Sequence, residues 1–517
     1  MQIMDKETWK NDLPAFREKT EAFYAGEVKM GEYKGFSGYY GSYAQKGGKA
    51  SMLRLRMPAG RVTKEKLAFI AGTIRKYHVP RAHFTTCQTI QLHDLDKDMV
   101  YNIMEEAIDN GIITIGGGGD FPRNVMCSPL SGVEKEEYFD VLPYAEAAGA
   151  FLMQFIKAEK MPRKLKVCFS NSPANLTHAT FRDLGFVATA EKKFDVYSAG
   201  GLGNNPRLGV KVAEGIDPEM ICYYIKAMWL TFRAYGDYEN RGHARTRYMQ
   251  EILGGAEEYK KAYLEKLQEA LDSGEDLRIK VEEKTTAKKG DGSVISGNRI
   301  MEQKQNGLYT VIWHPIGGQP SMDSLCALSD IIADMEDVEM RLSPDEAAYI
   351  VNLTGTEAEK VLKATADSAE TIFETSVSCI GASTCQVGVR DSQALLRACV
   401  DAVRKAGIPD GALPQIHISG CPSSCGTHQV GKIGFRGGMK RVDGKPASAF
   451  VMVIAGCEKQ GAEVLGTEVG AILEEEIPEF LVKLGKAVAD SGLDYDSWIK
   501  ENRAQFDEIA AEYLAEK

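Results

Sequence analysis

The feature that most constrains the fold is an internal repeat with a constant offset of 258 residues. In the first copy, SMLRLRMPAGRVTKEKLAFIAGTI leads to HFTTCQTIQLHDL, and in the second, YTVIWHPIGGQPSMDSLCALSDII leads to RLSPDEAAYIVNL. Gly60 matches Gly318 and Leu95 matches Leu353 without a gap between them. We therefore expect two similar half-domains, with chance similarity between two αβ units as the alternative.

Each copy reads as a strand, a turn that contains glycine, an amphipathic helix and an alternating strand. A second kind of unit follows each copy, near residues 121–275 and 370–517, and each begins with a loop that contains cysteine and ends in long helical stretches. The polar segment Val281–Gln305 is the predicted linker between the halves. We predict four domains, at residues 1–120 (with an N-terminal extension), 121–280, 300–368 and 369–517.

The chain has eleven cysteines, an odd number that favours reduced thiols over a disulfide framework. Four of them form two close pairs, in CIGASTC at residues 379–385 and in CPSSC at residues 421–425. Four thiolates can bind zinc or an iron–sulfur cluster. The gaps of five and three residues, in glycine-rich loops, favour a group larger than one zinc ion. A structural zinc site and four unrelated core cysteines remain the alternatives.

Charge and hydropathy exclude several classes of protein. The net charge of -11 argues against nucleic acid as the main partner. No run of about 20 apolar residues could span a membrane, and the first residues lack a basic segment followed by an apolar one. We expect a cytoplasmic protein without a membrane partner.

The pattern C-x5-C followed by G-C-P-x-x-C-G resembles the signature of sirohaem-dependent sulfite and nitrite reductases. The resemblance implies an α+β fold, with pseudo-twofold duplication of ferredoxin-like half-domains and of α/β domains that bind sirohaem and the iron–sulfur cluster. It also implies that a [4Fe–4S] cluster is held by Cys379, Cys385, Cys421 and Cys425, and that Cys425 also ligates the sirohaem iron. A shared thiolate would couple the two cofactors electronically.

Three further stretches match the family and supply positive charge: MLRLRMPAG, FPRNVMCSP and MPRKLKVCFS. The resemblance places Arg54, Arg123, Lys164 and Lys166 around the open face of the sirohaem, as the catalytic cations. Arginine offers planar donors to a small oxyanion, and a buried lysine can also deliver a proton. The alternative for each residue taken alone is a solvated strand end.

Other stretches are expected to hold the eight carboxylates of sirohaem. The glycine-rich loop AGGLGNNPRLG offers backbone amides, although an ordinary tight turn is its alternative. HFTTCQTIQLH departs from the family motif, because His83 and Cys87 stand where arginine is usual, as does His417 before the second cysteine pair. The predicted cofactor contacts are Arg56, His83, Thr85, Gln91, His93, Arg163, Gly201, Gly203, Asn204, Arg207, Arg245 and Arg247.

The predicted reaction is the six-electron reduction of sulfite to sulfide. The pair Lys164 and Lys166 favours sulfite, since asparagine is common at the second position in nitrite reductases of the family. The alternatives are nitrite reduction to ammonia at the same site, which the stretch CGTHQVGKIGF favours, and a non-catalytic iron–sulfur or zinc protein. An external donor such as ferredoxin is implied, with Lys46 and Lys49 as one candidate docking patch.

Overall fold

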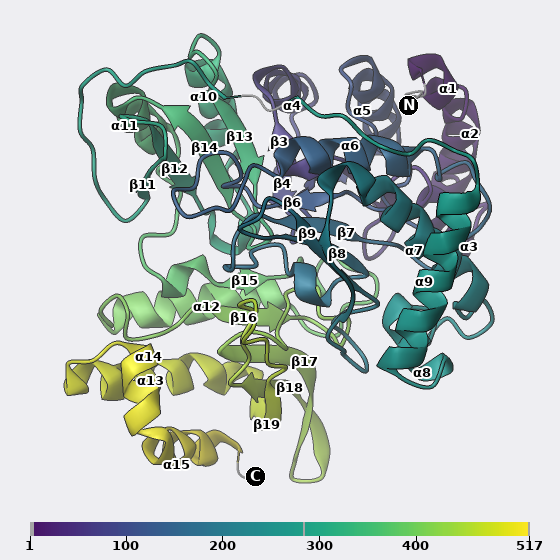
Figure 1. Cartoon of the computed structure of the whole chain (residues 1–517). Helices are drawn as coiled ribbons and strands as arrows, with labels where there is room; N and C mark the ends of the chain where they lie inside the picture. The colour runs from purple at the N-terminus through teal and green to yellow at the C-terminus, as the bar shows by residue number, and fades with distance from the viewer. Residues whose placement is uncertain (1–4, 283–284, 515–517) are drawn as a thin grey trace. The chain divides into compact units, whose positions relative to one another are not determined.

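A computed structural model describes residues 5–282 and 285–514 of the chain (Figure 1). The chain divides into two compact units, which are described separately. The first contains Met1–Gly201, Pro206–Trp313 and Pro320–Ala366, and the second contains Leu202–Asn205, His314–Gln319 and Asp367–Lys517.

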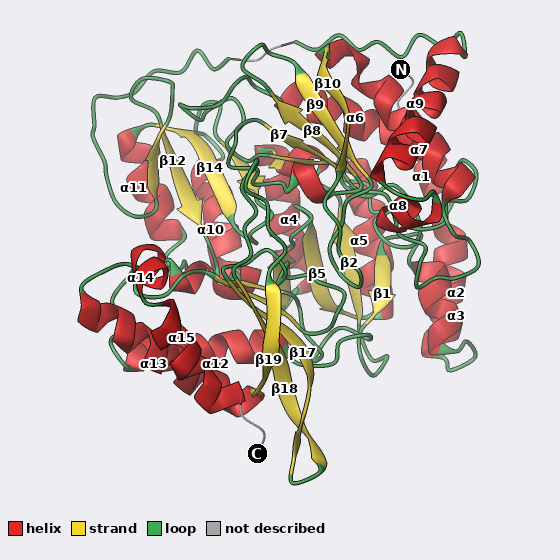
Figure 2. Ribbon diagram, turned by 60° about the horizontal axis from the view of Figure 1, so that its bottom comes forward, coloured by secondary structure: helices red, strands yellow, loops and turns green. Residues whose placement is uncertain are grey.

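Both units contain helices and strands (Figure 2). The helices are α1 (Lys6–Lys10), α2 (Leu13–Tyr24), α3 (Met30–Ser37), α4 (Lys64–Tyr77), α5 (Lys97–Asp109), α6 (Leu142–Met153), α7 (Ile221–Tyr235), α8 (Met249–Ile252), α9 (Ala256–Asp272), α10 (Met322–Ile332), α11 (Gly355–Ala364), α12 (Ser392–Lys405), α13 (Ile477–Ser491), α14 (Tyr495–Glu501) and α15 (Arg503–Leu514). The strands are β1 (Ser42–Ala44), β2 (Ser51–Leu55), β3 (Arg61–Val62), β4 (Arg81–Phe84), β5 (Ile90–Leu95), β6 (Met126–Cys127), β7 (Val167–Ser170), β8 (Leu184–Ala188), β9 (Phe194–Ser198), β10 (Val210–Ile216), β11 (Ile300–Glu302), β12 (Tyr309–Trp313), β13 (Glu339–Leu342), β14 (Ala348–Leu353), β15 (Val377–Ser378), β16 (Ile416–Ser419), β17 (Ile433–Val442), β18 (Lys445–Ile454) and β19 (Thr467–Leu473).

The repeat in the sequence is a repeat in the fold. The first copy forms the antiparallel sheet β1-β2-β5-β4, and the second forms β11-β12-β14-β13 in the same order, with β3 added at its edge. The backbone keeps the 258-residue register, because Gln88 and Glu346 both have positive φ, of 53° and 68°. Asp94 and Asn352 match in the same way, with φ of 60° and 63°. The predicted α+β duplication is confirmed.

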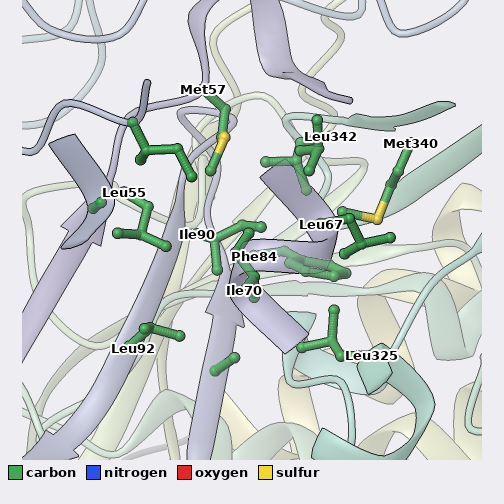
Figure 3. Close-up of a cluster of buried hydrophobic side chains, with 14 of the residues drawn as sticks. Leu55, Met57, Leu67, Ile70, Phe84, Ile90, Leu92, Leu325, Met340 and Leu342 are labelled. Carbon is green, nitrogen blue, oxygen red and sulfur yellow. The ribbon is translucent and has the colours of Figure 1, made fainter. Parts of the chain in front are cut away.

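One hydrophobic core joins the two half-domains of the first unit. Leu67 and Ile70 lie on one face of α4, at the three-residue spacing of an amphipathic helix, and are fully buried. Leu325 of α10 and Met340 of β13 come from the second copy and pack in the same cluster (Figure 3). Burial of each large side chain stabilises the fold by about 1.5–3 kcal/mol, so both copies contribute to one core.

A second pair of sheets is also duplicated. The first unit contains β10-β9-β8-β7-β6, and the second contains β19-β18-β17-β16-β15. In both sheets the first three strands in chain order are parallel and the last two are antiparallel. β17 and β18 extend past the others as a long hairpin (Figure 2). The predicted long helical stretches near the ends of these regions are α9 and α13.

The structure differs from the sequence-based expectations at two places. The single strand expected after each amphipathic helix is a hairpin, β4–β5 and β13–β14. Nearly every residue of β5 and β14 is buried, so the alternation that would mark two separate strands is absent. The expected linker contains β11, which pairs with β12, and part of it lies outside the described residues. The four domain boundaries stay a prediction.

None of the helices in the described ranges is long and apolar enough to cross a membrane.

Candidate functional site

Three predicted residues form a polar row on the sheet of the first half-domain. Arg54 of β2 lies opposite Gln91 of β5 and donates to the carbonyl oxygen of Gly117. With the amide oxygen of Gln91 turned toward Arg54, its distance from Nε is 3.1 Å, and the amide nitrogen faces Nε2 of His93 at 3.2 Å. Burial lowers the pKa of His93 well below its usual value. The ring is therefore neutral near pH 7 and can relay hydrogen bonds.

Two further arginines are anchored by backbone carbonyl groups. Arg56 donates to the oxygens of Pro122 and Arg123, at 2.9 and 3.0 Å. Arg123 donates to the oxygens of Gly117 and Gly119, at 2.7 and 2.8 Å. Burial and the other arginines nearby lower the pKa of Arg56 to about 9 and that of Arg123 to about 10. Crowded, desolvated cations of this kind stabilise any anion that binds among them.

The motif that contains Lys164 and Lys166 directly precedes β7. The buried carboxylate of Asp183 holds its backbone in place. Asp183 accepts a hydrogen bond from the backbone N–H of Lys166 at 2.8 Å and from Arg245 at 3.1 Å. Burial acts to raise the pKa of Asp183, but Arg245, Thr246 and Lys166 outweigh it and lower the pKa. The carboxylate thus stays ionised and fixes the start of β7.

Arg163 is held differently from the other cations of its motif. It donates to Asp120 at 2.6 Å, and Arg241 donates to the same carboxylate at 2.8 Å. This pairing places Arg163 in a surface ion-pair network, with its side chain about a quarter exposed.

The β4–β5 hairpin contains two of the three departures from the family motif, and the third, His417, lies in β16. His83 is buried, and its Nε2 lies 3.4 Å from a carboxylate oxygen of Glu346. Thr85 and Thr89 share a hydrogen bond of 2.7 Å between their hydroxyl groups and hold the turn closed. Cys87 is half-buried at the tip of this turn.

The glycine-rich loop is divided between the two units. Gly201 and Arg207 form a bridge with two backbone hydrogen bonds, of 2.9 and 3.0 Å, in the first unit. Gly203 and Asn204 belong to the second unit, where the amide of Gln429 makes hydrogen bonds to both backbone groups of Gly203. Arg247 is buried, with its guanidinium 4.9 Å from the ring centre of Tyr248.

Both cysteine pairs lie in the second unit, on loops that follow neighbouring parallel strands. Cys379 follows β15, and Cys421 follows β16 by two residues. The sulfur of Cys379 accepts a hydrogen bond from the N–H of Gly420 at 3.2 Å and lies 3.2 Å from the hydroxyl of Ser392. Burial raises the pKa of the Cys379 thiol to about 12, and a bound metal would favour its thiolate.

Close backbone packing requires glycine between these loops. A side chain at Gly426 would lie 2.0 Å from the carbonyl oxygen of Ile418, and one at Gly420 would lie 2.5 Å from that of Arg390.

Among the described residues, no three His, Cys, Asp or Glu side chains lie close enough to hold one metal ion. Tetrahedral zinc would need sulfurs about 3.8 Å apart, whereas a cluster of four irons needs wider spacing.

A polar cavity of about 600 Å³ lies in the first unit, away from these residues. It is lined by paired charges, including Arg61 and Arg341, which both contact Glu339. None of the predicted site residues is among the described residues that line it.

Sequence reasoning missed several residues of the site. Asp183 and Asp120 orient predicted cations, and Asn124 donates to the carbonyl oxygens of Cys87 and Gln88 at 3.2 and 3.0 Å. Single acidic or amide residues in loops carry no local pattern. Asn124 follows Arg123 directly, so its place beside a predicted cation was the available signal.

Two descriptions of one family match the chain. "Nitrite and sulphite reductase 4Fe-4S domain" matches residues 118–271, and "Nitrite/Sulfite reductase ferredoxin-like half domain" matches residues 43–109. Ferredoxin–nitrite reductase of Betula pendula is 26% identical over 429 residues, covering 78% of this chain and 71% of the relative. The sulfite reductase [NADPH] hemoprotein beta-component of Geobacillus kaustophilus is 24% identical, covering 83% and 78%.

Ferredoxin–nitrite reductases are the more frequent among these curated relatives. The solved structure of the Mycobacterium tuberculosis NirA protein matches with a TM-score of 0.80 at 20% identity and covers 98% of each chain. At that identity the match concerns the fold, which is shared over nearly the whole length.

Proposed function

Because the chain belongs to the nitrite and sulfite reductase family, we propose that it reduces nitrite to ammonia with six electrons, and that sulfite is its second candidate substrate. Membership of this family implies sirohaem and a [4Fe–4S] cluster. The observation that carries the proposal is the group of cations in the first unit, in which Arg56 is buried and Arg54, Arg123, Lys164 and Lys166 are partly buried. Such a group suits a small oxyanion.

The donor sets fit the two cofactors. Four thiols on two tightly packed loops suit a cluster, and the N–H of Gly420 already points at the sulfur of Cys379. In the first unit, Nε of Arg245 is buried and without a partner among the described residues. A buried donor without an acceptor is costly, so a carboxylate of a bound tetrapyrrole would satisfy this group.

We propose the following contacts with the two cofactors. Cys379, Cys385, Cys421 and Cys425 would hold the cluster, and Cys425, the exposed cysteine of the four, would also hold sirohaem. When bound, sirohaem supplies the iron at which the oxyanion accepts electrons. The residues that would contact the carboxylates of sirohaem are Arg56, His83, Thr85, Gln91, His93, Arg163, Gly201, Gly203, Asn204, Arg207, Arg245 and Arg247.

The cations of the first unit bind the substrate and deliver protons. Arg54 and Arg123 are held by carbonyl groups of the same glycine-rich segment, so their guanidinium groups need little reorganisation when an anion binds. Lys164 and Lys166 are flexible point charges that can approach an oxygen atom of the substrate and give it a proton. Each oxygen that leaves as water requires two protons, which the lysines recover from solvent.

The choice between substrates rests on two observations that point in opposite directions. The similar curated proteins are mostly named nitrite reductases, whereas the pair Lys164 and Lys166 favours sulfite by resemblance. The relatives match over most of this chain, whereas the lysine pair is a single local feature. We therefore place nitrite first.

The electron donor is an external one-electron carrier such as ferredoxin. Lys46 and Lys49, both exposed in the turn between β1 and β2, form a basic patch that suits an acidic protein. Charge reversal of both lysines should raise the KM for ferredoxin and leave turnover with a small-molecule reductant unchanged.

Parallel steady-state assays of the anaerobically purified protein with nitrite and sulfite test the proposal. We expect turnover of both anions, with the larger kcat/KM for nitrite. A larger value for sulfite would restore the substrate preference predicted from the lysine pair. Turnover of neither anion by protein that contains both cofactors would refute the proposed function.

A further inference from the structure

A series of hydrogen bonds connects Arg54, which we assign to substrate binding, with Gln45 in the turn after β1. The side chain of Gln45 is 9% exposed. Its Oε1 accepts from the backbone N–H of Asp94 at 2.8 Å, and its Nε2 donates to a carboxylate oxygen of Asp94 at 2.6 Å. That carboxylate is paired with Arg81 at 3.0 Å. Because a backbone N–H only donates and an ionised carboxylate only accepts, both ends of the Gln45 amide are assigned.

The orientation of a second amide is fixed by Arg54. A guanidinium group only donates, so the amide oxygen of Gln91 faces Nε of Arg54 at 3.1 Å. The amide nitrogen of Gln91 then faces Nε2 of His93 at 3.2 Å. On the other side of the ring, Nδ1 of His93 lies 3.3 Å from Oε1 of Gln45. His93 is 1% exposed and thus lies between two amides whose orientations are both determined.

These contacts determine which nitrogen of His93 carries the proton. Nδ1 faces an acceptor and Nε2 faces a donor, so a neutral ring with its proton on Nδ1 satisfies both partners. A proton on Nε2 would instead lie against the N–H group of Gln91. Burial lowers the pKa of His93 well below its usual value, which agrees with a neutral ring. The hydrogen bonds therefore all run in one direction, from Arg54 to Asp94.

The second copy contains the same turn without this series. Gln303 matches Gln45 at the 258-residue offset, and the backbone N–H of each donates across its turn, at 3.0 and 2.8 Å. Gln303 is 4% exposed, but its Oε1 is buried without a hydrogen-bond partner among the described residues. Val351, which has no polar side-chain group, stands at the position of His93. The turn thus forms without the contact to a ring, so that contact in the first copy needs a separate explanation.

We propose that Gln45 is a positioning residue of the oxyanion site. It fixes the proton of His93 on Nδ1, and the ring in turn holds the amide oxygen of Gln91 toward Arg54. A guanidinium group with a fixed acceptor needs little reorganisation when an anion binds to its other donors. Without Gln45, the proton of His93 is free to occupy either nitrogen, and Gln91 is free to turn its amide. This inference rests on the proposed function, in which Arg54 binds the substrate.

Neutron diffraction from crystals of the oxidised holoenzyme, exchanged into heavy water, locates the proton without turnover or bound substrate. We expect deuterium on Nδ1 of His93 and none on Nε2, with the amide deuterons of Gln91 beside Nε2. Deuterium on Nε2, or the amide oxygen of Gln91 beside the ring, would overturn the inference.

The effect on the site is measured by the dissociation constant for nitrite, obtained by optical titration of the oxidised holoenzyme. Gln45→Met is similar in volume and removes the acceptor for His93, so it should raise this constant about tenfold. Gln303→Met is the matched control, because it makes the same change in the same turn of the other copy, and it should leave the constant unchanged. Equal constants in the two variants would overturn the role of Gln45.

A paired exchange separates hydrogen bonding from packing. Gln45→Glu combined with Asp94→Asn interchanges the amide and the carboxylate, so an oxygen atom still faces Nδ1 of His93. The backbone accepts asparagine there, because Asn352 occupies the matching position of the second copy with φ of 63°. We expect nitrite binding close to that of the wild type. A constant as high as that of Gln45→Met would assign the loss to packing and overturn the inference.

The outcomes separate this inference from the proposed function. A proton on Nε2 of His93, or equal effects of the two methionine variants, overturns the role of Gln45 while the protein still binds and reduces nitrite. A holoenzyme that binds neither nitrite nor sulfite overturns both.

Discussion

The loop after β7 and the loop after β16 have matching backbones and different side chains. Asn175 and Ser424 both have φ of 53°, at an offset of 249 residues. Side chains at Gly185 of β8 and Gly434 of β17 would lie 1.8 and 2.0 Å from the carbonyl oxygens of Ala179 and His428, so the strand after each loop requires glycine at the same position. Yet the first loop carries serine and leucine where the second has two cysteines, in the pairs Ser172/Cys421 and Leu176/Cys425.

The half-domain sheets differ in the same way. Arg54 lies opposite Gln91 in the first copy, and in the second copy the same register places Ile312 opposite Tyr349. Tyr349 is buried in an apolar cluster that Ile312 packs against. The sheet face that carries a charged side chain in the first copy carries buried apolar and aromatic side chains in the second.

The comparison distinguishes the residues that the backbone fold requires from those that the proposed reaction requires. Glycines, strand order and positive-φ positions are kept in both copies because the backbone path depends on them. Thiols occur only in one copy of the loop, and the paired arginine and glutamine only in one copy of the sheet. Each copy thus supplies groups that the other lacks.

The largest loss of activity is expected when a cysteine of the second loop is replaced by the residue at the matching position of the first loop. Cys421→Ser gives the second loop the residue of the first, and should remove a cluster ligand. We expect turnover to fall by more than about 100-fold, together with a loss of iron. Iron content and nitrite reduction measure this, with Cys457→Ser, a half-buried thiol outside the motif, as control. Full iron content in Cys421→Ser would contradict the assignment.

A large effect on stability is expected at Asp183, whose counterpart is Lys432. Asp183→Asn leaves Arg245 without a buried anion and should lower the free energy of unfolding by about 3 kcal/mol. Because the pKa of Asp183 is lowered in the fold, its stabilisation is present above about pH 4 and is lost as the pH falls through the folded pKa.

Lys432→Gln is the control for this variant. Its salt bridge to Asp496 is about half exposed, so it should change the free energy of unfolding by less than about 0.5 kcal/mol. Denaturant titrations at several pH values compare the two variants. Equal effects at both positions would show that Asp183 does not organise the cations.

A substitution in the polar row of the first sheet should lower kcat/KM for nitrite, whereas a substitution at the apolar counterpart in the second copy should not. Arg54→Leu is expected to lower kcat/KM for nitrite by about 100-fold, as does the loss of a donor to a developing oxyanion. Ile312→Leu in the second copy should cost less than about 1.5 kcal/mol of stability and leave kcat/KM unchanged. Similar kinetic losses in both variants would contradict the division between the copies.

The smallest effect tests the structural equivalence of the copies. Asp96 caps α5 and Thr354 caps α11, at the 258-residue offset. Asp96→Ala and Thr354→Ala should each lower the free energy of unfolding by about 1 kcal/mol, which thermal melts can compare. A cost at only one position would indicate that the two helix starts are not equivalent.

The gap-free offset predicted two similar half-domains because it preserves the hydrophobic pattern of helices and strands, and the family resemblance implied their duplicated α+β fold. The hairpins β4–β5 and β13–β14 could not be recognised, since β14 is buried at every position and shows no alternation. The cysteine motif and the cations carry their own local signals. The hydrogen bonds from Asn124 to the carbonyl oxygens of Cys87 and Gln88 join distant segments of the chain, and no local pattern encodes them.

The most direct test is the absorption spectrum of anaerobically purified protein during a titration with nitrite. Bands of sirohaem should be present, should shift as nitrite binds, and should accompany iron in excess of one atom per chain. In Arg54→Leu the same bands should be present, but the shift should require about 100-fold more nitrite. A colourless protein, or a cluster spectrum that nitrite leaves unchanged, would contradict the account.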